Sequence, residues 1–171
     1  MRTKINSFLI MIVLLTTFSV EAQNKRKSKK DTHQFRYEIE CIGEGNSGTY
    51  AIKVFSYSKK PNVAIEAAKR NAVHGIIFKG LASGNCVSKP ALARNPNLEN
   101  EKADFFKSFF ADGGKYSKFV TTSTDGAIEA GDVTKVSKKE YKVGVNVSVN
   151  ISLLRKDLEA AGIIQGLGSR F

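Results

Sequence analysis

The chain has 171 residues, of which 42% are apolar and 25% are charged, and it carries a formal net charge of +11. This length favours a single domain, and the composition excludes a wholly disordered chain, a collagen and a disulfide-dense miniprotein. The excess of basic residues makes polyanions candidate partners.

The N-terminus has the three parts of a secretory signal peptide. Arg2 and Lys4 precede the apolar stretch Phe8–Phe18, and small side chains lead up to a cleavage site after Ala22. The apolar stretch is far shorter than the about 20 residues that a membrane-spanning helix needs. We therefore expect residues 1–22 to be removed, which predicts a periplasmic or secreted protein without stable membrane insertion.

A basic segment, residues 23–34, follows the predicted cleavage site. Its cations are Lys25, Arg26, Lys27, Lys29 and Lys30. Such a charge run is either a solubilising spacer or a flexible arm that binds a polyanion, such as nucleic acid, an acidic polysaccharide or a lipid headgroup.

The folded part is expected to begin at residue 35 with two strands. Tyr37, Ile39 and Cys41 alternate with acidic residues, which is typical of a half-buried strand. A glycine-rich loop over 44–48 leads into Thr49–Ser58, whose β-branched and aromatic residues predict the return strand.

Pro61 is expected to open a long helix over residues 62–79. The apolar face of this helix is formed by Ile65, Ala68, Ala72 and Ile76. Small alanines allow a close approach to a sheet, and Gly75 predicts a close contact on this helix. Lys53, Phe55 and Tyr57 share one face of the preceding strand, and basic residues interleaved with aromatic ones are also found at nucleic-acid-binding surfaces. We expect Phe55 and Tyr57 to pack beneath the helix instead.

The middle of the chain has weaker patterns. Residues 80–98 predict a loop, and residues 99–111 predict a short amphipathic helix. A strand is expected over Tyr116–Thr122, followed by a turn at Asp125-Gly126.

The strictest alternation covers Tyr141–Ile151, where valines alternate with polar residues and predict a long strand with one polar face. The strand is expected to start near Val133 and to bend around Lys138-Lys139. Ser152 is expected to cap a closing helix over residues 153–161.

Together these elements predict an α+β domain over residues 35–162, in the order β-β-α-(α)-β-β-α. The sheet is expected to be mainly antiparallel, with the helices packed on one face. Residues 163–171 are expected to form a loose C-terminal tail.

The chain contains no complete catalytic, cofactor-binding or metal-binding motif, so no such residues or cofactors are assigned. In an exported protein an even number of cysteines favours a disulfide, here Cys41 with Cys86, and two separate buried thiols are the alternative. His74, on a flank of the long helix, is expected at a surface or boundary position. The glycine spacing of Gly43–Gly48 resembles a dinucleotide-binding loop, but a strand rather than a helix is expected to follow it.

The helix and the last strand resemble a family of bacterial envelope domains. The segment Ala67–Ala72 and the strand Tyr141–Ile151, followed by a helix with Leu153, Leu154 and Leu158, are similar to the lipoprotein-20 type and to the N-terminal domain of flagellar assembly protein T. The similarity covers about residues 35–160. The resemblance implies an exported, non-catalytic assembly or binding domain and supplies no site residues. The chain departs from this family in its Gly45–Gly48 hairpin and in lacking a lipid-anchor cysteine.

The function expected from the sequence is therefore that of a non-enzymatic envelope protein that acts as a protein-binding or assembly domain. Its candidate contact surface is the polar side of the last strand, formed by Lys142, Gly144, Asn146, Ser148 and Asn150. One alternative is a polyanion-binding protein that uses the basic arm. A second is an exported hydrolase, which would need a cleft that unites His74, a cysteine or serine, and a carboxylate.

Overall fold

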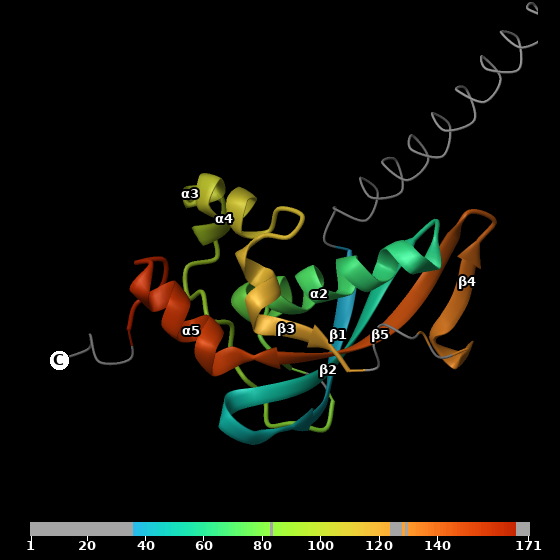
Figure 1. The fold of residues 1–171 in the computed structure, drawn as a ribbon, viewed down its shortest axis with the longest axis horizontal. Helices are drawn as coiled ribbons and strands as arrows, with labels where there is room; N and C mark the ends of the chain where they lie inside the picture. Colours follow the sequence, from blue (N-terminus) through green and yellow to red (C-terminus); the bar gives the residue numbers. More distant parts are fainter. Residues whose placement is uncertain (1–35, 83, 124–127, 129, 167–171) are drawn as a thin grey trace, which may run out of the picture.

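The structure, a computed structural model, describes residues 36–166 with the exception of 83, 124–127 and 129. Within them an antiparallel sheet is combined with helices, so the predicted α+β class is confirmed (Figure 1). The predicted signal peptide 1–22, the basic arm 23–34 and the turn at Asp125-Gly126 lie outside the described residues.

Three long strands form the centre of the sheet. They are β1 (Tyr37–Glu44), β2 (Thr49–Ser58) and β5 (Glu140–Asn150), and β2 pairs with both of the others. The free side of β5 is shared by two short strands, β3 (Val120–Thr122) and β4 (Val133–Ser137). Strand β3 pairs with the C-terminal half of β5 and β4 pairs with its N-terminal half. Every pairing between these strands is antiparallel.

The prediction of one bent strand from Val133 onward is wrong. The chain reverses at Lys138-Lys139, so that Thr134 of β4 lies opposite Lys142 of β5. The side-chain oxygen of Ser137 accepts a hydrogen bond of 3.3 Å from the backbone N–H of Lys139 and stabilises this turn. The pair Lys138-Lys139 contains neither glycine nor proline, so the sequence carries no strong turn signal at this point.

The predicted strand over Tyr116–Thr122 is wrong in its first half. Residues Lys115–Phe119 form the 3-10 helix η2, and only Val120–Thr122 are extended. With three residues per turn, Tyr116 and Phe119 lie on the same side of η2, and both are buried.

Helix α2 (Pro61–Phe78) lies across one face of the sheet (Figure 1). Its alanines are buried against apolar side chains of β2 and β5, among them Ile52, Val54 and the four valines of β5. The expected close contact at Gly75 is present, because a Cβ atom there would lie 2.7 Å from Cδ1 of Ile39. Among the described residues, no helix is both long and apolar enough to cross a membrane.

The helix predicted over 99–111 is divided in two. Helix α3 (Leu98–Glu101) and helix α4 (Ala103–Phe109) meet at Lys102, whose ψ of 35° is not helical. The phenylalanines of α4 and the residue that follows it pack with the aromatic rings of η2, and this cluster joins the core: Phe106, Phe109, Phe110, Tyr116 and Phe119.

Helix α5 (Ile151–Ala160) begins one residue after β5 ends. The expectation that Ser152 caps this helix is wrong, since the side-chain oxygen of Asn150 accepts a 2.9 Å hydrogen bond from the backbone N–H of Leu153. Asn150 remains in the extended conformation of the strand, which is the conformation that an N-cap residue requires.

The two candidate caps give a matched pair of variants. We expect Asn150→Ala to lower the free energy of unfolding by about 1 kcal/mol, because the N–H of Leu153 loses its acceptor. Ser152→Ala is expected to change it by no more than about 0.5 kcal/mol, as at other exposed positions without a capping role. Urea unfolding followed by circular dichroism measures both, and equal losses would contradict the assignment of the cap.

The C-terminal end of α5 is closed by a Schellman motif. Gly162 has a φ of 65°, its N–H donates to the carbonyl of Glu159, and the N–H of Ile163 donates to the carbonyl of Leu158. Ile163 and Ile164 are half-buried and pack against the core. The expectation of a loose tail from residue 163 onward is therefore wrong for these two residues, and 167–171 lie outside the described residues.

Candidate functional site

The sheet has a second face, on the side away from α2, which we call the open face. It is formed by side chains of the three long strands: Glu38, Glu40, Lys53, Phe55, Tyr57, Lys142, Asn146 and Ser148. The expectation that Phe55 and Tyr57 pack beneath the helix is wrong, because Ile52 and Val54 occupy that side of β2. Successive strand residues point to opposite faces, so both rings share the face of Lys53.

The strand register brings aromatic rings and charges together on the open face. Tyr57 lies opposite Lys142, and Phe55 lies between Glu38 and Gly144. The hydroxyl of Tyr57 donates a 2.8 Å hydrogen bond to Glu38, and the other oxygen of Glu38 accepts a 2.7 Å bond from Lys142. The Lys142 ammonium is also 4.6 Å from the centre of the Phe55 ring.

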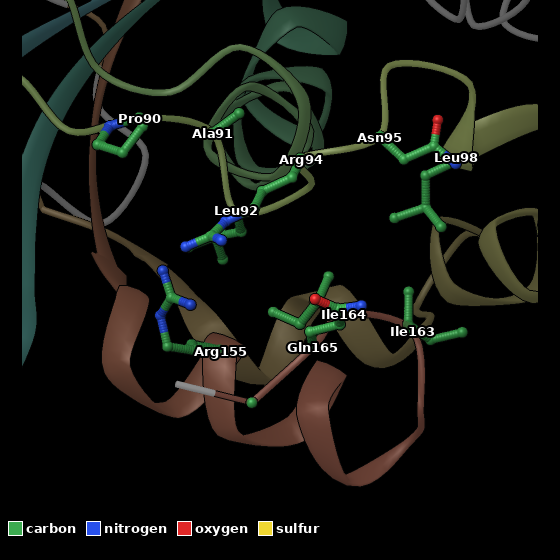
Figure 2. Close-up of a pocket in the computed structure, with 11 residues that line it drawn as sticks. Pro90, Ala91, Leu92, Arg94, Asn95, Leu98, Arg155, Ile163, Ile164 and Gln165 are labelled. Carbon is green, nitrogen blue, oxygen red and sulfur yellow. The ribbon is translucent and has the colours of Figure 1, made fainter. Parts of the chain in front are cut away.

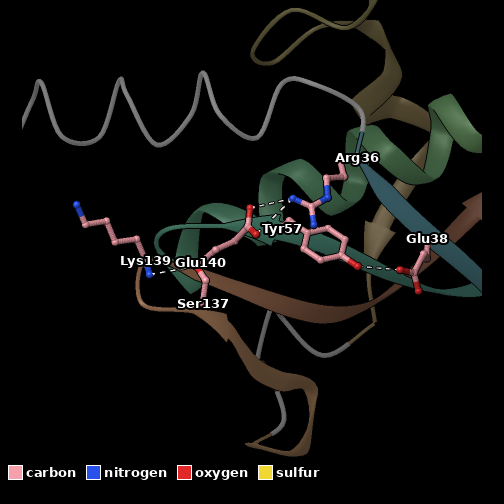
Figure 3. A network of polar contacts seen from close by, with 6 residues as sticks. All are labelled: Arg36, Glu38, Tyr57, Ser137, Lys139 and Glu140. Atoms are coloured by element: carbon pink, nitrogen blue, oxygen red, sulfur yellow. Dashed lines mark hydrogen bonds and ion pairs between the residues drawn. The ribbon is translucent and has the colours of Figure 1, made fainter.

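Two further ion pairs lie beside these contacts on the open face. The guanidinium of Arg36 lies 4.0 Å from the centre of the Tyr57 ring and pairs with Glu140 at 3.2 Å (Figure 3). Lys53 pairs with Asp132 at 2.5 Å. Gly144 leaves the necessary room, since a Cβ atom there would lie 3.0 Å from Cε of Lys53 and 3.1 Å from a carbon of Phe55.

The open face carries little excess charge at neutral pH. The hydrogen bond from Lys142 lowers the pKa of Glu38, with a smaller contribution from Tyr57, and the same bond raises the pKa of Lys142. Both groups therefore stay ionised. Each of the cations Arg36, Lys53 and Lys142 forms an ion pair with a carboxylate. The two aromatic rings are therefore surrounded by charges that largely cancel.

The structure brings three of the sequence-predicted contact residues together. Lys142, Asn146 and Ser148 lie half-buried on the open face, whereas the side chain of Asn150 is engaged in capping α5. The sequence analysis missed Arg36 and Glu38, and it placed Phe55 and Tyr57 on the wrong face. The even spacing of the two rings from Lys53 placed all three side chains on one strand face, but it did not show which face the helix covers. The arm cations lie outside the described residues.

The two cysteines form a disulfide. Cys41 of β1 and Cys86 are joined, with 5.7 Å between their Cα atoms, so the alternative of two separate thiols is wrong. The backbone N–H of Asn85 also donates a 2.8 Å hydrogen bond to the carbonyl of Cys41. At Gly84, φ is 101° and a Cβ atom would clash with the backbone of Cys41, so only glycine fits this crossing.

His74 is buried rather than at the surface. The hydroxyl of Tyr37 lies 2.6 Å from Nδ1 of His74, and Oε1 of Glu99 lies 3.2 Å from Nε2. A hydroxyl, an imidazole and a carboxylate are thus in line. The residues differ from those required for the hydrolase hypothesis, because the hydroxyl belongs to a tyrosine and both cysteines are in the disulfide.

Burial controls the chemistry of this line of groups. It lowers the pKa of His74 to about 3, with Lys79 and Arg70 contributing in the same direction, so the imidazole is neutral. Burial also raises the pKa of Tyr37 well above its ordinary value, and the charge of Glu99 adds to this effect. The phenol therefore stays protonated at neutral pH, and the contacts among the three side chains connect β1, α2 and α3.

The described part of the chain contains no group of three or more histidine, cysteine or carboxylate side chains placed to hold a metal ion. Comparison of the chain with family models, curated proteins and solved structures gave no match.

Proposed function

We propose that the protein is an exported, non-enzymatic envelope protein that binds a partner protein through the open face of its sheet. The observation that supports this proposal most directly is the placement of Phe55 and Tyr57 on the face away from α2, where both residues remain partly exposed. Tyrosine, phenylalanine and arginine are enriched at protein interfaces, and the residues that dominate binding energy are often of these types.

The contacts within the open face would reduce the cost of binding. Arg36 and Glu38 hold the Tyr57 ring from two sides, so its orientation is set before a partner arrives. Binding then costs less side-chain entropy than it would with freely rotating groups. Asn146 and Ser148, which lie further along β5 on the same face, would supply hydrogen bonds to the partner.

The balance of charge favours a protein over a polyanion at this face. A nucleic-acid surface needs cations that are free to neutralise phosphates, together with aromatic rings on which bases stack. Here Lys53 and Lys142 are already neutralised by Asp132 and Glu38. The polyanion alternative depends on the arm Lys25–Lys30, which lies outside the described residues.

Two features support the proposed location. The segment 1–22 has the pattern of a signal peptide, and disulfides such as Cys41–Cys86 persist in oxidising compartments outside the cytoplasm.

Site-specific photocrosslinking in the producing cell tests the proposed interface. A benzophenone amino acid placed at Asn146 or Ser148 is expected to give one discrete crosslinked species, because both positions lie on the open face. The same amino acid at Lys156, which is exposed on α5, is the control and is expected to give none. Adducts of equal yield from Lys156, or no adduct from the open face, would contradict the proposal.

A second variant separates binding from folding. Tyr57→Ser is expected to lower the yield of the Asn146 adduct about tenfold or more, as truncation of an aromatic hot-spot residue does. Lys107→Ser on α4 is the matched surface control and is expected to leave the yield unchanged. Circular dichroism checks that both variants are folded, and an unchanged yield with folded Tyr57→Ser would exclude this face as the contact surface.

A further inference from the structure

A pocket of about 460 Å³ lies between the loop that follows α2 and the C-terminal end of α5 (Figure 2). We call it the arginine pocket. Its apolar lining includes Leu92 and Leu98 from the loop side and Ile163 and Ile164 from the segment after α5. Arg94 and Arg155 line it from the two opposite sides.

Both walls of the arginine pocket are held by backbone hydrogen bonds. On the loop side, the N–H groups of Leu92 and Ala93 donate to the carbonyls of Ile76 and Ile77 at the end of α2. On the other side, the Schellman motif at Gly162 fixes the direction of the chain. The pocket is therefore largely formed without a ligand, as binding sites for small molecules usually are.

The two arginines give the pocket a positive end. Figure 2 shows both guanidinium groups turned toward the space between the loop and α5. Arg155 forms an ion pair of 3.6 Å with Glu159, which is longer than the 2.5 Å and 2.7 Å pairs of Lys53 and Lys142, and within the described part of the chain Arg94 has no carboxylate partner. A guanidinium binds carboxylate or phosphate through two parallel N–H groups, so this end of the pocket suits an anion.

The apolar part continues beyond the arginines. A smaller pocket of about 200 Å³ shares Pro90, Leu92 and Arg155 with the arginine pocket. It is lined further on by Ile76 and Leu81 of the core side. A ligand held at Arg155 can therefore extend an apolar chain in either direction along Leu92.

We propose that the arginine pocket binds a single-chain anionic amphiphile, with its carboxylate or phosphate head on Arg94 and Arg155 and its alkyl chain on the isoleucines and leucines. The pocket combines two arginine side chains with an apolar lining, so a ligand that fits it needs both a negative charge and an apolar chain. This site is separate from the open face and does not depend on the function proposed for that face.

Calorimetric titration of the purified protein tests this site with ligands kept below their micellar concentrations. Decanoate and decyl phosphate are expected to bind with one molecule per chain, and the two probes distinguish a carboxylate head from a phosphate head. Decanol, which lacks the charge, and butyrate, which lacks the chain, are each expected to bind at least about tenfold more weakly, because a charge-assisted hydrogen bond and a buried alkyl chain are each worth more than this factor.

Substitution of the arginines locates the binding. Arg94→Gln and Arg155→Gln are each expected to weaken decanoate binding about tenfold or more, whereas Lys107→Gln on α4 is expected to leave it unchanged. Arg94 is exposed and makes no ion pair within the described residues, so its variant should fold normally. Decanoate affinity that is unchanged in both arginine variants, or binding of many molecules per chain, would overturn the proposal.

Discussion

Removal of the Cys41–Cys86 disulfide is expected to lower the free energy of unfolding by about 4 kcal/mol, the largest effect that we predict. The two cysteines are 45 positions apart, and the crosslink restricts the unfolded chain over that whole loop. The bond also holds Gly84 and Asn85 against β1, the strand at the edge of the sheet. The double variant Cys41→Ser/Cys86→Ser, compared with the oxidised protein by urea unfolding, measures the loss.

Reduction of the wild-type protein provides the control for this variant. With dithiothreitol the wild type should match the stability of the double variant, since both then lack the crosslink. Oxidised and reduced wild-type protein with equal stability would contradict the prediction.

The buried His74 is expected to make the protein less stable as the pH falls. Its pKa is about 3 in the folded chain and close to 6.5 when unfolded, so between these values the unfolded chain binds a proton that the folded chain does not. The contribution of His74 to the free energy of unfolding is fully present above about pH 6.5 and is lost progressively toward pH 3. From pH 7.5 to pH 4.5 the loss from this residue is about 2 to 3 kcal/mol.

The neighbours of His74 set the size and sign of the measured slope. Lys79 and Arg70 add to the effect of burial on the histidine pKa. Burial raises the pKa of Glu99, so this carboxyl takes up a proton more readily in the folded chain and offsets part of the loss at low pH. The readout is therefore the slope of stability against pH, rather than stability at one pH.

The variant His74→Gln isolates the histidine contribution. Glutamine keeps a donor and an acceptor near Tyr37 and Glu99 but does not titrate, so the slope between pH 6.5 and 4.5 should fall by up to about 1.4 kcal/mol per pH unit. Urea unfolding at several pH values measures it. An identical slope in the variant would show that other groups cause the acid sensitivity.

Local patterns predicted the elements whose signals lie within a short stretch of chain. The bounds of β2 were predicted as observed, Thr49–Ser58, and α2 was placed within one residue at each end. The reason is that both signals are local. Alternating β-branched residues favour a strand, and alanines after a proline favour a helix, through effects on the backbone of the same short segment. The sequence predicted Ser152 as the cap of α5, but Asn150 keeps the extended conformation at the end of β5 that an N-cap residue requires, and it caps the helix instead.

The candidate site was harder to predict because it depends on pairing between distant segments. The sequence showed that β5 has a polar side. It did not show that Arg36 and Glu38, more than 100 positions away, would contact side chains on that side. Their pairing partners, Glu140 and Lys142, are each separated from them by 104 positions. Such contacts arise from strand register, which is set by the sheet as a whole.

By itself the sequence determined the α+β class, the antiparallel character of the sheet and the main helix, because these follow from hydrophobic periodicity along single segments. Only the tertiary structure decided that Phe55 and Tyr57 face away from α2, that His74 is buried between Tyr37 and Glu99, and that Arg94 and Arg155 line one pocket. In each case the outcome depends on which side of an element is covered by another, and that is a property of packing between segments far apart in the chain.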